Sequence, residues 1–286
     1  MDARERYIET NKIRLHVMEN GPADGPMVMF LHGFPEFWYA WRKQISYFAD
    51  KGYLVVTPDQ RGYNLSDKPK GIASYAIDEL AKDALGIIDF YQRDRIFLVG
   101  HDWGAAVSWW VALQHPERIA RLVIMNVPHP AVMAKTLFTN AKQMAKSWYI
   151  FYFQLPGAVE KFALADNYQW PVSLLAENSR PGTFKPAELE AYRQAFLQPE
   201  AFSSMVNWYR AFLQVPAAAP PSFRISMPTL VLWGINDVAL LPEMADKSMA
   251  FCDQGRLVKF EKATHWLQHE EADTINPLMD EFFRPV

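Results

Sequence analysis

Short apolar runs alternate along the chain with segments that place their apolar residues on one helical face. One such segment carries Trp41, Ile45 and Phe48 at helical spacing, and a second begins at Ile77. Strands that alternate with helices are typical of an α/β fold, with a mostly parallel sheet and helices on both of its faces. The apolar runs that predict buried strands are 27–31, 53–56, 96–99, 122–125, 229–233 and 257–260. Two amphipathic runs near the start of the chain, 7–9 and 12–18, predict an antiparallel pair at the edge.

One long interval interrupts this alternation. Residues 127–224 show no strand signal, but they are rich in Trp, Tyr and Phe and helical in pattern. Proline clusters flank the interval, as expected where a chain leaves and re-enters a domain. The alternative is a series of ordinary helices that cover the sheet, but the aromatic density favours the roof of a pocket. We therefore predict a helical cap (lid) at 128–224, inserted into a core formed by 1–127 and 225–286.

Composition narrows the classes of partner. The 286 residues are 50% hydrophobic and carry a formal net charge of −3 without a basic block, which argues against nucleic acid and anionic membranes. There is one cysteine, no apolar run of membrane-spanning length and no evident signal peptide, so we expect a cytoplasmic protein. No cluster of metal ligands or phosphate-binding loop appears, so we expect neither a metal nor a cofactor. The sequence does not indicate the oligomeric state.

The pentapeptide Gly-His-Asp-Trp-Gly at 100–104 is the most informative motif. It lies between a predicted strand and a predicted helix, which is the context of a nucleophile elbow, a strained turn that lifts one side chain above the sheet. Asp102 occupies the position that usually holds serine. A carboxylate nucleophile forms esters with alkyl carbons, which indicates epoxides or haloalkanes as substrates. The alternative is an aspartate that caps the following helix.

Two further candidates follow predicted strands. Asp237 comes after the strand at 229–233, and His265 after the strand at 257–260. Ligands and catalytic groups gather at the carboxyl ends of such strands, and the order nucleophile, acid, base is that of the α/β-hydrolase arrangement. Asn126 is another possible position for the acid, but asparagine cannot ionise. His101 and His269 are weaker candidates for the base, because an elbow turns the first away and the second is expected on the next helix.

The stretch His-Gly-Phe-Pro-Glu at 32–36 follows the first parallel strand. We expect it to supply a backbone N–H beside the nucleophile, so that Phe34 and Trp103 form an oxyanion hole. The alternative is a simple Gly-Pro turn at the end of a strand. Glu36 is expected either to face the mouth of the pocket or to cap the helix that follows.

Over essentially its full length the chain resembles the epoxide hydrolases of the α/β-hydrolase superfamily. By this resemblance, Tyr149 and Tyr209 match the two lid tyrosines that hold the epoxide oxygen, and the Phe34–Pro35 bond is cis. The motifs that carry the resemblance are HGFP at 32–35, DQRGY at 59–63, GHDWG at 100–104, Asp237, THW at 264–266, WYIFYFQLPG at 148–157 and NWYR at 207–210.

The expected chemistry has two steps. Asp102 opens the epoxide to give an alkyl ester while the tyrosines protonate the alkoxide, and water activated by His265, which Asp237 orients, then hydrolyses the ester. Tyr152 is an alternative donor if it shares the helix face, and Tyr209 has the spacing of an ordinary apolar stripe. The residues expected to line the substrate pocket are Phe34, Pro35, Trp103, Tyr152, Phe153 and Trp266.

Three other functions share part of this pattern. Haloalkane dehalogenases have the Asp nucleophile and a Trp like Trp103, but they commonly carry Asn in place of Phe34 and need no tyrosine pair. Haloacid dehalogenases, of which the fluoroacetate enzymes are the example, typically place Arg where Trp103 stands. A non-catalytic ligand receptor on the same fold often lacks a triad member, whereas this chain has all three. An esterase is disfavoured because the elbow has no serine.

Overall fold

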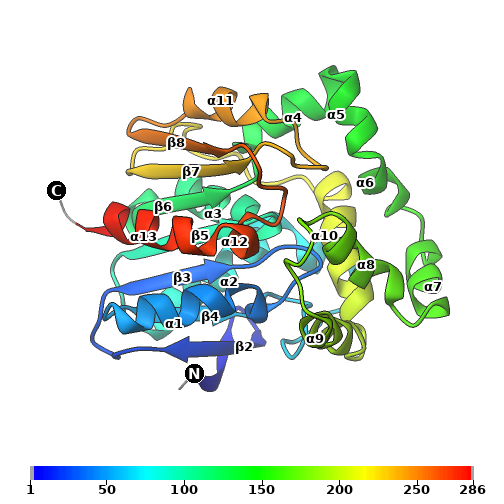
Figure 1. Ribbon diagram of the computed structural model, residues 1–286, viewed down its shortest axis with the longest axis horizontal. Helices are drawn as coiled ribbons and strands as arrows, with labels where there is room; N and C mark the ends of the chain where they lie inside the picture. The colour runs from blue at the N-terminus through cyan, green and yellow to red at the C-terminus, as the bar shows by residue number, and fades with distance from the viewer. Residues whose placement is uncertain (1–2, 285–286) are drawn as a thin grey trace.

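The computed structural model describes residues 3–284, and its centre is an eight-stranded sheet in the order β1-β2-β4-β3-β5-β6-β7-β8 (Figure 1). β2 pairs antiparallel with both β1 and β4, and all the later neighbours pair parallel. The predicted parallel strands and the antiparallel edge pair are therefore confirmed. The strands are β1 (Arg4–Thr10), β2 (Ile13–Asn20), β3 (Met27–Leu31), β4 (Leu54–Pro58), β5 (Ile96–His101), β6 (Ile119–Met125), β7 (Thr229–Gly234) and β8 (Gly255–Phe260).

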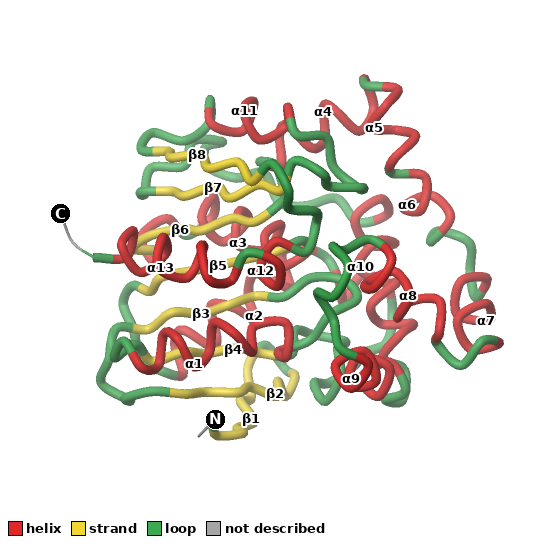
Figure 2. The backbone as a smooth tube through the Cα atoms, in the orientation of Figure 1, coloured by secondary structure: helices red, strands yellow, loops and turns green. Residues whose placement is uncertain are grey.

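Helices cover both faces of this sheet (Figure 2). One apolar cluster joins α1 and α13 to one face, and a second joins α2, α3 and α11 to the other. No helix in residues 3–284 combines the length and apolar character needed to cross a membrane. The helices are α1 (Arg42–Asp50), α2 (Ile77–Phe90), α3 (Trp103–Gln114), α4 (Pro130–Thr139), α5 (Ala141–Lys146), α6 (Trp148–Tyr152), α7 (Ala158–Ala165), α8 (Gln169–Glu177), α9 (Pro186–Phe196), α10 (Ala201–Gln214), α11 (Glu243–Met249), α12 (Leu267–Glu270) and α13 (Ala272–Phe283), with short 3-10 turns at Trp38–Trp41, Ile72–Tyr75 and Pro116–Arg118.

The central strands are apolar along their whole length because both of their faces are covered. Every residue of β3, β4 and β7 is buried, which is the pattern of strands inside a parallel sheet rather than at its surface. The parallel register places the carboxyl ends of β5, β6, β7 and β8 along one edge. Side chains that follow these strands in the sequence are thereby brought to the same end of the sheet.

The chain between β6 and β7 is helical, as predicted, and no strand occurs in this stretch of the described residues. In Figure 1 helices α5 to α10 lie beyond the ends of the strands, and α4 lies beside α11. The buried side chains of this segment, such as Phe153 and Tyr192, belong to the same apolar cluster as the α2–α3 face of the sheet. We refer to residues 128–224 as the insertion.

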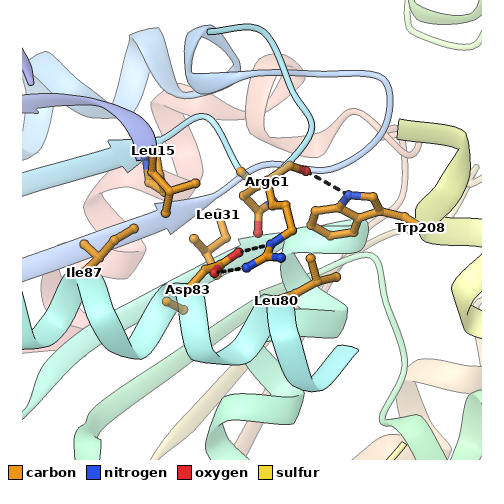
Figure 3. Close-up of a pocket in the computed structure, with 10 residues that line it drawn as sticks. Leu15, Leu31, Arg61, Leu80, Asp83, Ile87 and Trp208 are labelled. Carbon is orange, nitrogen blue, oxygen red and sulfur yellow. Dashed lines mark hydrogen bonds and ion pairs between the residues drawn. The ribbon is translucent and has the colours of Figure 1, made fainter. Parts of the chain in front are cut away.

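A buried ion pair lies where the insertion meets the sheet (Figure 3). The Arg61 guanidinium donates to both Asp83 carboxylate oxygens, at 2.7 and 2.6 Å, and the Trp208 indole N–H of α10 donates to the Arg61 carbonyl at 3.0 Å. The pocket around these groups has a volume of about 10 Å³, which is room for one water molecule at most. These contacts therefore join α10 to the core and leave no room for a ligand.

Candidate active site

Asp102 stands at a sharp turn between β5 and α3. Its backbone has φ 49° and ψ −124°, a conformation that L-residues rarely adopt and that stores strain where a site requires it. The flanking glycines are required by close packing, because a Cβ at Gly100 would collide with the Gly104 carbonyl and a Cβ at Gly104 with the Leu31 carbonyl. The predicted strained turn between strand and helix is thus present in the structure, and the role of Asp102 as a nucleophile stays a prediction.

The helix-capping interpretation of Asp102 is wrong. Asp102 occupies the N-cap position of α3, but its side chain accepts no hydrogen bond from the first turn of the helix. One carboxylate oxygen, Oδ1, instead accepts a hydrogen bond of 2.7 Å from the Phe34 N–H, on a different loop. Asp102 also lines a cavity whose other walls come partly from the insertion, so its carboxylate faces that segment rather than its own helix.

Phe34 and Trp103 are the two residues expected to present a backbone N–H beside Asp102. The Phe34 N–H already contacts Oδ1, and Trp103, as the first residue of α3, has an N–H without an acceptor within the helix. The Phe34–Pro35 peptide bond is cis, as the family resemblance implied. Gly33 passes so close to the nucleophile that a Cβ there would overlap the Asp102 side chain. One carboxylate oxygen of Asp102 is thus bound by a backbone N–H, and the role of Phe34 and Trp103 as an oxyanion hole stays a prediction.

Asp237 and His265 meet Asp102 at the same edge of the sheet. His265 Nδ1 lies 2.7 Å from Asp237 Oδ2, and His265 Nε2 lies 3.4 Å from Asp102 Oδ2. The histidine therefore bridges the two carboxylates, with one ring nitrogen held by each. All three are supplied by segments that follow parallel strands, which is why the sequence places them together.

Asp237 is held in place by a shell of donors. Its Oδ1 accepts from the backbone N–H groups of Ala239 and Leu240, at 2.7 and 2.9 Å. Its Oδ2 accepts from the Asn126 side-chain amide at 2.7 Å, and Asn126 Oδ1 in turn accepts from the Gly234 N–H at 3.1 Å. Asn126, which the sequence offered as the alternative acid, thus lies at the site and donates to the acid instead.

Each charged group among Asp102, Asp237 and His265 shifts the pKa of its neighbours toward the charged form. Burial alone would lower the pKa of His265, but the carboxylates of Asp237 and Asp102 outweigh it and raise that pKa well above its usual value. Burial would raise the pKa of each aspartate, yet the neighbouring His265 holds both pKa values below their usual range. The pKa shifts therefore favour a protonated His265 between two ionised carboxylates in the resting site.

Tyr149 of α6 and Tyr209 of α10 face Asp102 from the insertion. All three line one cavity of about 80 Å³, and the two tyrosine rings lie edge to face with centroids 5.8 Å apart. Burial, together with the Asp102 charge, raises the pKa of both phenols above the usual value. Both hydroxyls consequently carry their protons at neutral pH and can donate them to an oxygen bound near Asp102.

Apolar side chains form most of the remaining wall of this catalytic cavity. Besides Asp102 and the two tyrosines, its lining consists of Trp103, Ala106, Val127, Met133, Ile150, Phe212 and Leu240. The sequence singled out Trp103 among these and missed the others, because Ala, Val, Met, Ile, Phe and Leu in a cavity wall look like core residues. Ala106 carried a usable signal, since it stands four residues after Asp102 and hence on the same face of α3.

Several residues expected in the pocket lie outside this lining. Phe34 and Phe153 pack against Tyr209, with ring centroids 5.2 and 4.9 Å from its ring centroid. Trp266 packs against His265 at 5.2 Å, and Tyr152 packs against its helix neighbour Trp148 at 5.9 Å. Pro35 is buried in the loop beside them. Phe34, Phe153 and Trp266 thus contact residues of the candidate site. Direct contact with a substrate remains a prediction for all five residues.

Both expectations for Glu36 are wrong, because its carboxylate is only 1% exposed and lies within a polar network. Oε1 contacts His269 Nε2 at 2.6 Å and accepts from the Tyr192 hydroxyl at 3.0 Å, while Oε2 lies 3.3 Å from His101 Nδ1. The other His101 nitrogen, Nε2, lies 2.7 Å from the His265 carbonyl oxygen. The network therefore supports the segment that carries His265. These partners are far apart in sequence, so no local pattern could reveal it.

Comparisons with known proteins identify the family of this chain. A family model described as an alpha/beta hydrolase fold matches residues 26–272. The chain belongs to the α/β-hydrolase family. Among the relatives of this α/β-hydrolase, the AB hydrolase superfamily protein YfhM of Bacillus subtilis is 40% identical over 98% of this chain and 97% of its own length. Epoxide hydrolase 1 of Caenorhabditis elegans is 38% identical over 97% of this chain and 69% of its own length.

Solved structures resemble this α/β-hydrolase closely. The crystal structure of Bacillus megaterium epoxide hydrolase in complex with an inhibitor is 30% identical, with a TM-score of 0.89, and the match covers 97% of this chain and 99% of that one. The sequence and structural relatives therefore place this α/β-hydrolase among those that include the epoxide hydrolases. In residues 3–284 no group of three or more His, Cys, Asp or Glu is arranged to hold a metal ion.

Proposed function

We propose that this protein is an epoxide hydrolase, which converts an apolar epoxide and water to a vicinal diol. The observation that carries the proposal is that Asp102, Tyr149 and Tyr209 line one apolar cavity. A carboxylate on one wall and two protonated phenols on another match the two needs of epoxide opening, a nucleophile for carbon and an acid for oxygen. The epoxide hydrolases among its relatives support the same activity.

The first step requires no general base. Asp102 is ionised and attacks a ring carbon, so one carboxylate oxygen forms a C–O bond as the C–O bond of the ring breaks. The departing oxygen takes a proton from Tyr149 or Tyr209, because the negative charge of an alkoxide would otherwise have no compensating partner in an apolar cavity. The products of this step are an alkyl ester of Asp102 and a tyrosinate that later regains its proton from His265 or from water.

The second step is hydrolysis of this ester. His265 takes a proton from a water molecule, whose oxygen attacks the carboxyl carbon of Asp102. The Phe34 and Trp103 N–H groups stabilise the resulting oxyanion, and Asp237 stabilises the imidazolium. When the intermediate collapses, the ester oxygen leaves with the diol and takes a proton, and the Asp102 carboxylate retains one oxygen from water.

Ester formation also prepares His265 for its role as a base. In the resting site the Asp102 charge helps to raise the pKa of His265. Alkylation removes that charge, so the His265 pKa falls toward its usual value and the ring can become neutral. The first step therefore favours the protonation state that the second step needs.

The tyrosine pair gives a prediction with an internal control. We expect Tyr149→Phe and Tyr209→Phe each to lower kcat on styrene oxide by about 10²-fold, the usual contribution of a positioned general acid. Tyr152→Phe is the matched control, because Tyr152 is on the same helix as Tyr149 but does not line the cavity. Steady-state measurement of kcat on styrene oxide for the three variants shows which tyrosines donate the proton. A large loss in the Tyr152 variant alone would move the donor role to that residue.

The pH dependence follows from His265. Because the neutral ring is the base, ester hydrolysis should slow as the pH falls through the His265 pKa of the alkylated enzyme, while Asp102 remains ionised and alkylation continues. We expect the covalent ester to accumulate in the wild-type protein at low pH and to disappear at high pH. Quench-flow followed by intact mass spectrometry measures the ester fraction. An ester fraction that is independent of pH would argue against His265 as the base.

The proposal also assigns a role to each of the two parts of the chain, the core and the inserted cap. We propose that 1–127 and 225–286 form the catalytic core, which supplies Asp102, Asp237 and His265, and that 128–224 form a cap that supplies the two tyrosines. Epoxide and water are then the only reactants, without a metal or a cofactor. The cytoplasmic location predicted from the sequence stays a prediction.

The experiment that tests the function is turnover of styrene oxide and of a bromoalkane by the purified protein. The proposal requires the release of many equivalents of diol per equivalent of protein. Bromide release without diol formation would assign the site to a dehalogenase, and binding without turnover of either substrate would assign it to a receptor.

A further inference from the structure

A second and larger cavity adjoins the catalytic cavity. Its volume is about 540 Å³, compared with about 80 Å³ for the cavity that contains Asp102. We call it the outer cavity. Its wall comes from α3, α4, α10 and the chain just after α10, together with Tyr75, Ile77 and Phe223. The residues that line both cavities are Trp103, Ala106, Val127, Met133 and Phe212.

The floor of the two cavities follows one face of α3. Ala106 and Trp110 stand four and eight residues after Asp102, so their side chains share a face of the helix with the nucleophile. Ala106 lines both cavities and Trp110 lines only the outer one. Eight residues of α-helix correspond to about 12 Å. The lining of the outer cavity therefore extends along α3 to about 12 Å from Asp102.

Size decides which part of a substrate each cavity accepts. An apolar cavity of about 150 Å³ is large enough for benzene, and pockets for drug-sized ligands span roughly 300–1,000 Å³. At about 80 Å³ the catalytic cavity has room for an oxirane ring but not for an aromatic ring beside it. At about 540 Å³ the outer cavity has ample room for the ring.

The wall of the outer cavity favours an apolar occupant. No charged side chain lines it, and the polar side-chain atoms of three of its aromatic residues, Trp110, Trp208 and Tyr75, are already bonded elsewhere. The Trp110 N–H donates to a carboxylate at 2.8 Å, the Trp208 N–H to a backbone carbonyl at 3.0 Å, and the Tyr75 hydroxyl to another carbonyl at 2.8 Å. Gln214 also lines it, and its amide donates to another glutamine side chain at 3.0 Å. A polar group placed here would lose its water and gain few partners.

We propose, building on the proposed function, that the preferred substrates are terminal epoxides that carry one large apolar substituent. The oxirane lies in the catalytic cavity against Asp102 and the tyrosines, and the substituent lies in the outer cavity. Because the catalytic cavity is small, it leaves no room for a second large substituent on the oxirane. The cavity pair thus selects substrates by the size and polarity of a single substituent.

A substrate series tests the proposal on the wild-type protein. We compare kcat/KM for propylene oxide, for glycidol, which has a polar substituent, and for phenyl glycidyl ether, which has an aromatic one. We expect phenyl glycidyl ether to exceed each of the others by at least about tenfold, since burial of a ring is worth that much or more. Equal values for the three would overturn the inference but leave the proposed function intact. Failure to hydrolyse any of them, without an Asp102 ester, would count against the proposed function itself.

A variant then ties the selectivity to the outer cavity. Ala134 is exposed on α4 and lines only the outer cavity, so Ala134→Trp places an indole in that space. We expect the ratio of kcat/KM for phenyl glycidyl ether to that for propylene oxide to fall about tenfold. Lys135→Trp is the control, because Lys135 is the next exposed residue and does not line the outer cavity. An unchanged ratio in the Ala134 variant, or an equal fall in both, would contradict the assignment of the substituent to this cavity.

Discussion

Replacement of Asp102 by asparagine is expected to lower the turnover of epoxides on the order of 10⁵-fold, the scale of losing a covalent nucleophile. Asparagine keeps the shape of the side chain and can still accept the hydrogen bond from the Phe34 N–H, but it carries no negative charge to attack a ring carbon. The measurement is the steady-state rate on styrene oxide, with an unfolding curve to show that the elbow survives. A rate within about tenfold of the wild type would mean that another group attacks the epoxide.

A fold control is necessary because the turn at Asp102 is strained. The positive φ of 49° is maintained by close packing around Gly100 and Gly104, which the substitution leaves in place. We therefore expect the asparagine variant to unfold at nearly the same denaturant concentration as the wild type. A coincident loss of stability and activity would make the kinetic result uninformative, and Asp102→Ser would then be the variant to compare.

Replacement of His265 by glutamine should stop the catalytic cycle at the Asp102 ester. Asp102 needs no base for its attack, so the variant is expected to consume about one equivalent of epoxide and then to lose turnover by about 10⁴-fold or more, because ester hydrolysis has no base. Intact and peptide mass spectra after incubation with styrene oxide show whether the adduct is on the peptide that contains Asp102. The combined Asp102→Asn and His265→Gln variant is the control, and it should remain unlabelled.

Other outcomes of this experiment have distinct meanings. An adduct on another peptide would refute the nucleophile assignment. An adduct from a bromoalkane but not from an epoxide would move the protein to the dehalogenases. Continued turnover by the His265 variant would show that water is activated by another group, for which His101, whose ring centroid lies 4.8 Å from that of His265, is the nearest imidazole.

The triad was predictable because topology and sequence order determine it together. Asp102, Asp237 and His265 each follow an apolar strand, and parallel strands present their carboxyl ends at one edge. The prediction therefore needed only the strands and the order of polar residues after them. The tyrosines were different, since their place on helices outside the sheet came from resemblance to a family and not from periodicity.

The unpredicted parts of the site depend on contacts between distant segments. Glu36 meets His269 and Tyr192, and neither partner lies near it in sequence or shares a repeating pattern with it. The residues of the cavity walls could not be predicted from the sequence for another reason. Met133 and Phe212 are apolar residues on helices, and only the packing of α4 and α10 over α3 decides that they border a cavity rather than fill a core.

The most direct test of the ester mechanism is a single turnover by the wild-type protein in ¹⁸O-labelled water, with enzyme in excess over styrene oxide. Because water attacks the carboxyl carbon of Asp102 in this mechanism, the first diol released should be unlabelled. The label should instead appear in the peptide that contains Asp102. Label in the first diol, with none in that peptide, would show direct attack of water on the epoxide and would contradict the assignment of Asp102 as the nucleophile.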